Sequence, residues 1–219
     1  MDKITHRINQ LVKFSSFLLL VDVYALLNFT IMDSIVVSNV LKGIHYKRSD
    51  LVHLETISVY LNQFHLVVGV FFVVTFLAWF FNAFKNLQKL DTVFYESKYW
   101  TILAWIVPVF NLFLPFTILA KMCRRSYLYL RKNQISYGKK YPFSLFVLWW
   151  FIYVVFILIN LFRNVLLMYG GFKFLSDLNV YMHLLNFIGV LICFNFVRHF
   201  IRLQCLMSSV LPENEEIAE

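Results

Sequence analysis

The residues best placed to do chemistry are polar side chains that interrupt apolar runs. Asp22 interrupts the run from Phe14 to Met32, and the helical rise per residue places it near the middle of a membrane-spanning helix. An ionisable group at that depth is costly, which makes it a candidate functional group by default. Its carboxyl would either form an interhelical hydrogen bond or provide a proton or cation site.

Further polar side chains lie at helical spacing in two other apolar runs. Asn62 and His65 are three residues apart, and Asn179, His183 and Asn186 share one face of a later run. Such residues can hold helices together by hydrogen bonds, each of which contributes about 1 kcal/mol or less to helix association. They can also line a pore, a pH-sensitive gate or a ligand site. The intramembrane polar cluster predicted from these runs comprises Asp22, Asn62, His65, Asn179, His183 and Asn186.

Enzyme motifs are missing from the sequence. It has no Walker A loop, no G-x-S-x-G, no H-E-x-x-H and no glycine-rich dinucleotide turn. The histidines form no second-site pair for haem, and no cysteine or carboxylate completes a metal site at ligand spacing. The three cysteines imply no disulfide framework. We therefore expect no enzymatic activity, no cofactor and no metal.

Composition places these residues in a membrane. The chain has 219 residues, of which 60% are hydrophobic and 15% charged, and a soluble domain of this length cannot bury so much apolar surface. The net charge of +8 is better explained by membrane topology than by nucleic-acid binding, because cytoplasmic loops carry an excess of Lys and Arg. We expect no nucleic-acid partner.

Four apolar runs predict an all-α membrane helix bundle with four transmembrane helices. The predicted spans are about 11–32, 59–81, 143–162 and 175–197, and a loop at 33–58 includes a short helix of its own. The first run could be a signal peptide, but no cleavage pattern follows it, so an uncleaved span is favoured. One membrane domain would cover residues 1–211, and residues 212–219 would form an acidic, frayed tail.

A fifth apolar run, 100–120, decides the topology. Pro108 and Pro115 lie on either side of Asn111 in this run, and two prolines break a helix into short pieces. Five crossings would divide the 20 Lys and Arg residues as 8 against 12, whereas four crossings divide them as 15 inside and 5 outside. We predict a re-entrant or interfacial segment at about 100–134, with both termini in the cytoplasm of a bacterium and the spans in its inner membrane.

The end of this segment has the pattern of a basic amphipathic helix. Its expected apolar stripe is Phe116, Leu119, Ala120, Cys123, Tyr127 and Leu130. Its basic face is Lys121, Arg124, Arg125, Arg131 and Lys132. Such a helix suits the anionic lipids of the inner leaflet or an acidic partner. The alternative is a kinked fifth span followed by a solvated basic loop.

Several of these residues also form a motif. The combination consists of Trp79, Asn86, Trp105, Pro108, Asn111, Pro115, Arg124, Ser126, Trp149, Trp150 and Gln204. It resembles the domain of unknown function 4328 family of bacterial membrane proteins, over about residues 76–204. The chain departs from that family's pattern at Lys121, where an acidic residue is expected, and at Cys123, where Trp is expected. The resemblance supports the membrane architecture and implies no reaction.

The function expected from these features is assembly rather than catalysis. A small membrane protein with polar helix faces and a basic inner face is expected to form a homo-oligomer, to recruit a cytosolic protein partner, or to do both. A bacterial defence or stress system, in which it acts as a membrane sensor or anchor, is one setting for it, although no residue encodes that setting. The alternative is a small oligomeric ion channel or transporter whose polar path includes Asp22, His65 and His183.

Overall fold

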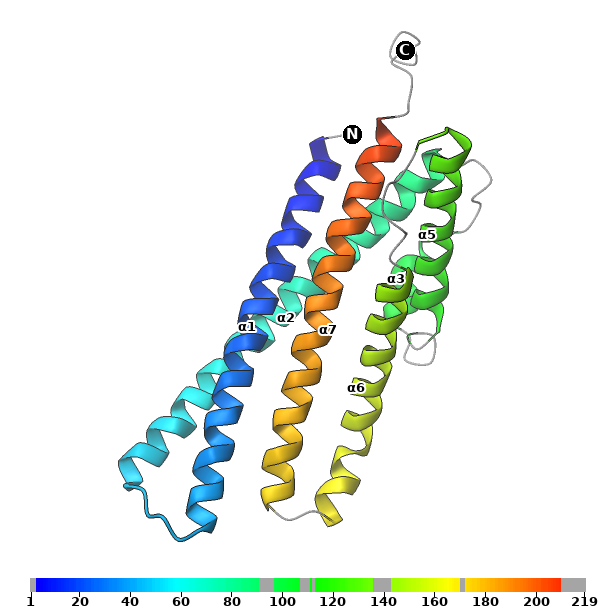
Figure 1. Cartoon of the computed structure of the whole chain (residues 1–219). Helices are drawn as coiled ribbons and strands as arrows, with labels where there is room; N and C mark the ends of the chain where they lie inside the picture. Colours follow the sequence, from blue (N-terminus) through cyan, green and yellow to red (C-terminus); the bar gives the residue numbers. More distant parts are fainter. Residues whose placement is uncertain are drawn as a thin grey trace. The chain divides into compact units, whose positions relative to one another are not determined.

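The computed structural model describes residues 3–90, 97–106, 111, 113–135, 143–169 and 172–209, and these residues contain helices and no strand. The predicted all-α fold is therefore confirmed (Figure 1). The helices are α1 (Lys3–Leu41), α2 (Arg48–Leu90), α3 (Trp100–Ile106), α5 (Leu114–Lys132), α6 (Phe143–Tyr169) and α7 (Phe172–Ser208).

Four helices in the described part of the chain are long and apolar enough to cross a membrane. They are Lys3–Leu41, Arg48–Leu90, Ser144–Phe162 in α6 and Ser176–Ser208 in α7. The four predicted spans overlap these helices, but α1 and α2, with 39 and 43 residues, are much longer than the roughly 20 residues that a bilayer core requires. Hydropathy locates the apolar part of each helix, whereas backbone hydrogen bonding continues beyond it.

The loop predicted at 33–58 is wrong. Helix α1 continues to Leu41 and α2 starts at Arg48, so only residues 42–47 connect them, and the expected short helix is the beginning of α2. Gly43 has a φ of +86°, a left-handed conformation that glycine adopts without steric cost. The side-chain amide of Asn39 donates a hydrogen bond of 2.9 Å to the Tyr46 hydroxyl across this turn. The polar residues at 33–58 suggested a loop, but polar residues are equally compatible with an exposed helix.

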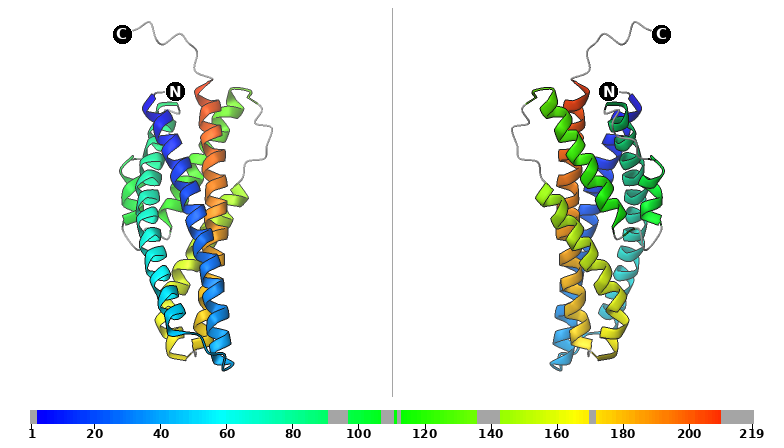
Figure 2. Two further views of the ribbon diagram at one scale, coloured as in Figure 1. Left: turned by 90° about the vertical axis from the view of Figure 1, so that its left-hand side faces the viewer. Right: turned by 90° about the vertical axis from the view of Figure 1, so that its right-hand side faces the viewer.

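The run at 100–120 is broken, as its prolines predict. Helix α3 ends at Ile106 and α5 begins at Leu114, with Pro115 in the first turn of α5. Proline suits that position because the first-turn N–H groups have no partner within the helix. Pro108 lies outside the described residues. Helix α3 has only 7 residues and packs against α5, which Figure 2 shows from two sides.

Contacts divide the chain into two compact units. Unit 1 comprises Met1–Lys13, Val73–Val147 and Asn195–Glu219, and unit 2 comprises Phe14–Phe72 and Leu148–Phe194. Each of α1, α2, α6 and α7 contributes residues to both units.

Unit 1 has a core rich in large aromatic side chains. Phe146 of α6 stacks on Phe116 of α5, with ring centroids 5.1 Å apart, and lies 5.3 Å from Phe196 of α7. Trp79 of α2 meets Phe200 of α7 edge-on at 5.6 Å. Aromatic rings bury more area than aliphatic side chains, so these contacts join four helices into a firm core.

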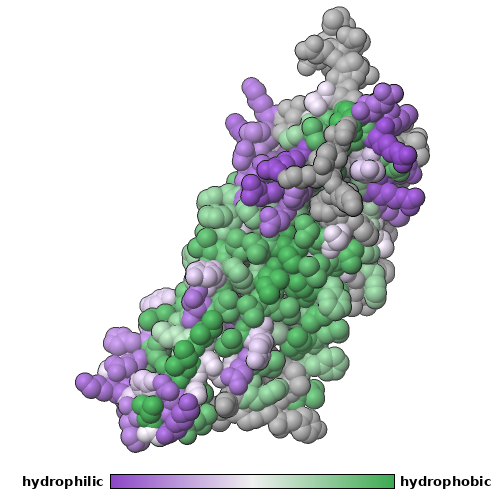
Figure 3. Space-filling view, in the orientation of Figure 1, coloured by the Kyte–Doolittle hydropathy of each residue, from purple (hydrophilic) through white to green (hydrophobic). Residues whose placement is uncertain are grey.

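Unit 2 has a smaller aliphatic core. Leu19 and Val23 of α1 pack with Val68 of α2, and partly buried residues of α1, α2 and α7 surround them. Many apolar side chains of this unit are exposed, including Leu66, Val67 and Tyr181. Figure 3 shows hydrophobic side chains over the long helices, as expected of side chains that face lipid.

Candidate functional site

Asp22 and His65 form an ion pair in unit 2. The Nδ1 atom of His65 lies 2.5 Å from the Oδ2 atom of Asp22, and the Asp22 side chain is almost completely buried. The His65 side chain retains 34% of its exposure. A hydrogen bond at this distance needs one proton between the two atoms, whichever residue carries it. The Oδ1 atom of Asp22 is buried and has no hydrogen-bond partner among the described residues.

The aliphatic core of unit 2 holds this pair in place. Leu19 and Val23 are on the α1 turn that carries Asp22, and Val68 follows His65 by three residues on α2. Burial of these apolar neighbours brings the two polar side chains together, with Asp22 on the buried side of the contact. Asp22 therefore faces the interior of its unit, and the pair provides the favourable contact that an intramembrane carboxyl needs.

Asn62 does not belong with this pair. Its side chain is exposed, and its amide donates a 2.9 Å hydrogen bond to the backbone oxygen of Ser58 on the same helix. The structure does not bring Asn62 to the Asp22–His65 pair, because a spacing of three residues places side chains on adjacent, not identical, parts of the helix surface, and its place in a wider cluster stays a prediction. Three of the predicted cluster residues lie half-buried on α7, and their membership stays a prediction: Asn179, His183 and Asn186.

A polar contact also joins α1 and α7 in unit 2. The hydroxyl of Ser34 on α1 donates a hydrogen bond of 3.4 Å to Asp177. Neither residue was predicted from the sequence, because both lie outside the predicted intramembrane cluster. Their contact adds a second polar connection between elements of this unit.

A threonine hydroxyl in unit 1 accepts two hydrogen bonds from amide side chains. Asn82 and Asn86 of α2 both donate to Oγ1 of Thr5 on α1, at 3.1 and 3.3 Å. These two hydrogen bonds use both acceptor lone pairs of the Thr5 hydroxyl oxygen. Gln204 of α7 donates at 3.3 Å to the backbone oxygen of Ala83. Sequence reasoning missed Thr5 and Asn82, although the four-residue spacing of the two asparagines indicated a shared face.

The motif tryptophans serve as packing residues. Trp105 of α3 meets Phe76 and Phe80 of α2 edge-on, with centroids 5.5 and 6.4 Å apart. Trp79 has no exposed surface, and its indole N–H has no hydrogen-bond partner among the described residues. In unit 2 the neighbouring residues Trp149 and Trp150 contact each other edge-on at 6.1 Å, and both contact Tyr153.

Helix α5 separates apolar and basic side chains onto different faces. Its buried residues are Pro115, Ile118, Leu119, Met122, Cys123, Ser126 and Leu130. Tyr127, which was expected in the apolar stripe, is 42% exposed, so that expectation is wrong. The buried stripe is rotated toward Met122 and Ser126, because contacts with neighbouring helices, rather than hydropathy alone, select the face.

The basic residues of α5 lie largely on its other face. Lys121, Arg124, Arg131 and Lys132 are exposed, and Arg125 is half-buried. Arg131 and Lys132 are in the last turn, where positive charge interacts favourably with the helix dipole. Hydrophilic side chains over this helix are visible in Figure 3. The arrangement presents an extended positive surface beside a buried apolar stripe.

A family match agrees with the resemblance noted in the sequence. The family described as Domain of unknown function (DUF4328) matches residues 47–204, well over half of the chain. The chain belongs to this family. No curated protein and no solved structure matches it.

Most DUF4328 motif residues described by the structure lie in unit 1. Pro115 lies in the first turn of α5, Ser126 is 1% exposed, and Asn86 and Gln204 make contacts between helices. Asn111 is half-buried, and Arg124 is the motif residue on the exposed basic face. Most of the described motif residues thus contribute to the packing of unit 1, and the motif includes neither Asp22 nor His65. Within the described residues, no group of three or more His, Cys, Asp or Glu side chains could hold a metal ion.

Proposed function

We propose that the protein is a non-enzymatic membrane protein that self-assembles and recruits an acidic cytosolic protein through the basic face of α5. The observation behind the proposal is the two-faced α5 helix, whose apolar side is buried in unit 1 and whose Arg124, Arg131 and Lys132 side chains are exposed. Charge complementarity raises the rate and specificity of association with acidic partners, and the same face attracts anionic lipid head groups.

The proposed location is the bacterial inner membrane, with both termini and α5 in the cytoplasm. The excess of Lys and Arg on that side in the four-span topology supports this orientation. Cysteine labelling tests it in a background in which the native exposed Cys205 is replaced by Ser. Lys98→Cys, just before α3, and Lys132→Cys, at the end of α5, should react with a membrane-impermeant reagent only from the cytoplasmic side. Labelling of the two positions from opposite sides would show that the segment crosses the membrane.

Native mass spectrometry of the purified protein in mild detergent tests the assembly part of the proposal. We expect an oligomer that retains phosphatidylglycerol or cardiolipin. Replacing Arg124, Arg131 and Lys132 together by Ala should reduce retention of anionic lipid severalfold, because each basic residue near an anionic surface contributes about 1 kcal/mol. Ala at Lys42, Lys47 and Arg48 is the matched control, with the same loss of three charges. A clean monomer that carries neither partner nor lipid would contradict the proposal.

A second candidate function is a small oligomeric channel or transporter for protons or cations. The buried Asp22 carboxyl beside the partly exposed His65 ring supports it, and His183 on α7 would extend the path. Flux into liposomes should then fall at least tenfold in Asp22→Asn and also fall in His183→Ala. Asp50→Asn changes an exposed carboxyl outside the polar path and is the control. The absence of wild-type flux over the whole accessible pH range would eliminate this candidate.

A further inference from the structure

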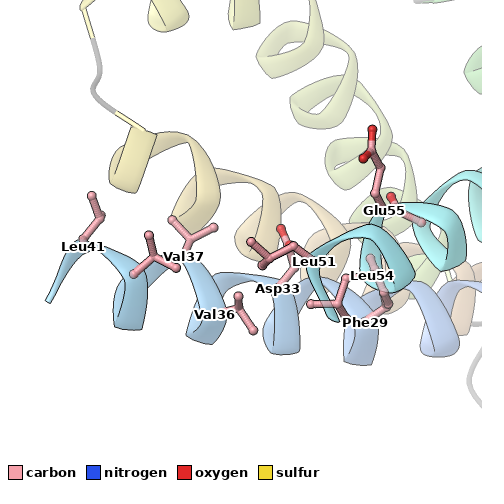
Figure 4. Close-up of a pocket in the computed structure, with 10 residues that line it drawn as sticks. Phe29, Asp33, Val36, Val37, Leu41, Leu51, Leu54 and Glu55 are labelled. Carbon is pink, nitrogen blue, oxygen red and sulfur yellow. The ribbon is translucent and has the colours of Figure 1, made fainter. Parts of the chain in front are cut away.

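A groove lies in unit 2 between the last turns of α1 and the first turns of α2. It encloses a volume of about 500 Å³. Figure 4 shows its wall, to which α1 contributes Phe29, Asp33, Val36, Val37 and Leu41 and α2 contributes Leu51, Leu54 and Glu55. Its dimensions are within the range typical of sites for small organic ligands.

The wall of the groove combines apolar side chains with two carboxyl groups. Apart from Asp33, Glu55 and Ser58, all of its lining residues are apolar, and the lining contains no Lys, Arg or His. Asp33 and Glu55 are exposed and form no ion pair with a described residue. The groove is therefore suited to a molecule that has both apolar surface and positive charge.

The turn between α1 and α2 gives the groove a defined geometry. Residues 42–47 connect the helices directly, and the hydrogen bond from Asn39 to Tyr46 closes the turn. The backbone N–H of Ile44 also donates to the Asn39 oxygen at 3.0 Å. A site whose walls are held before the ligand arrives avoids part of the entropic cost of binding.

We propose that this groove binds an amphipathic organic cation. The apolar body of the ligand would lie along Phe29, Val36, Val37 and Leu54, and its ammonium or phosphonium centre would lie by the two carboxylates. The predicted spans end at residue 32 and begin again at residue 59, so we expect Asp33 and Glu55 to lie near the edge of the membrane, where amphipathic molecules gather. The site shares no residue with the Asp22–His65 pair or with α5, so it extends beyond the proposed function.

Two ions of similar shape and opposite charge test the proposal. Tetraphenylphosphonium should bind the full-length protein saturably in phosphatidylcholine nanodiscs by equilibrium dialysis, and tetraphenylborate should show no saturable binding above empty nanodiscs. The double variant Asp33→Asn/Glu55→Gln should weaken cation binding about tenfold, since each exposed charge pair contributes modestly. Asp50→Asn removes an exposed carboxyl outside the lining and should leave binding unchanged.

A steric variant tests the site independently of charge. Val37→Trp places a large ring in the groove, whereas Ile35→Trp places it on an exposed neighbouring position that does not line the groove. Cation binding should be lost in the first and retained in the second. Equal saturable binding of both ions, cation binding unchanged in the double variant, or only unsaturable partition into lipid would each overturn the proposal.

Discussion

Unit 1 and unit 2 use their apolar side chains in different ways. Nearly all of the largest fully buried side chains among the described residues belong to unit 1, including Trp79, Phe80 and Phe146, and the exception is Val23 in unit 2. Unit 2 instead exposes large apolar residues such as Leu66 and Val67. Packing between side chains therefore stabilises unit 1, whereas unit 2 relies on lipid to cover much of its surface.

The two units also differ in the candidate functional residues that they hold. Unit 1 contains most of the DUF4328 motif, which forms a packed core and the basic helix α5. Unit 2 contains all six residues of the predicted intramembrane polar cluster and the acidic groove. Most residues of the family-like motif therefore lie in unit 1, whereas the ionisable groups that could bind a proton or a ligand lie in unit 2.

The largest difference in stability is expected when a phenylalanine is replaced by alanine in each of the two parts of α2. Phe80→Ala in unit 1 should lower the free energy of unfolding by about 3–5 kcal/mol, because it leaves a cavity around a side chain with no exposure. Phe64→Ala in unit 2 removes a ring that is 51% exposed and should cost less than about 1 kcal/mol. Thermal unfolding in detergent measures both. Equal destabilisation would break the contrast between the units.

Loss of the Thr5 hydroxyl should give the next largest effect. Thr5→Val removes the acceptor of the Asn82 and Asn86 amides while preserving shape, and we expect destabilisation of about 1–3 kcal/mol. Thr5→Ser keeps the hydroxyl and should recover most of this loss. The comparison requires denaturation curves in a single detergent. If Val were tolerated as well as Ser, hydrogen bonding would not contribute measurably to unit 1.

The Asp22–His65 pair should show a smaller but measurable coupling. A double-mutant cycle with Asp22→Ala and His65→Ala is expected to give an interaction energy of about 1 kcal/mol, typical of polar pairs between membrane helices. Stability of the four proteins is measured by the same unfolding assay. Additive effects would show that the pair does not hold α1 and α2 together, and would favour a role in ion movement over one in packing.

The turn at Gly43 should give the smallest effect. Gly43→Ala introduces a Cβ at a φ of +86°, where L-residues are strained, and we expect a loss of about 0.5–1 kcal/mol. The space around this position is open, so a larger loss would not come from a clash. Gly69→Ala, within α2 and also in open space, is the matched control and should be neutral or stabilising.

Much of the fold could be predicted from local patterns. Apolar runs identified the four long helices, and prolines identified the break between α3 and α5. The amphipathic pattern identified α5 as a two-faced helix, although the exposure of Tyr127 shows that its apolar stripe was displaced. These features depend on residues close together in sequence, which is why periodicity reveals them.

The Asp22–His65 contact depends on register and could not be predicted in the same way. Both residues were candidates, but their pairing requires knowing that α1 and α2 continue as helices to a turn at 42–47. With a loop assumed at 33–58, the helices could have been aligned at many heights. In the observed turn, Asp22 and His65 lie at nearly equal distances along the chain from the connection, and the short turn determines their pairing.

The same short turn has a consequence for how the chain enters the membrane. A lone helix with an aspartate at its centre faces an insertion cost of about 2.5–3.5 kcal/mol for that residue. Because α1 and α2 are joined so closely, they can leave the translocon as one helical hairpin, with His65 already beside Asp22. We expect a longer connection to separate the insertion of the two helices and to leave Asp22 without His65 until α2 follows. The short turn thus ties the order in which α1 and α2 enter the membrane to the insertion of Asp22.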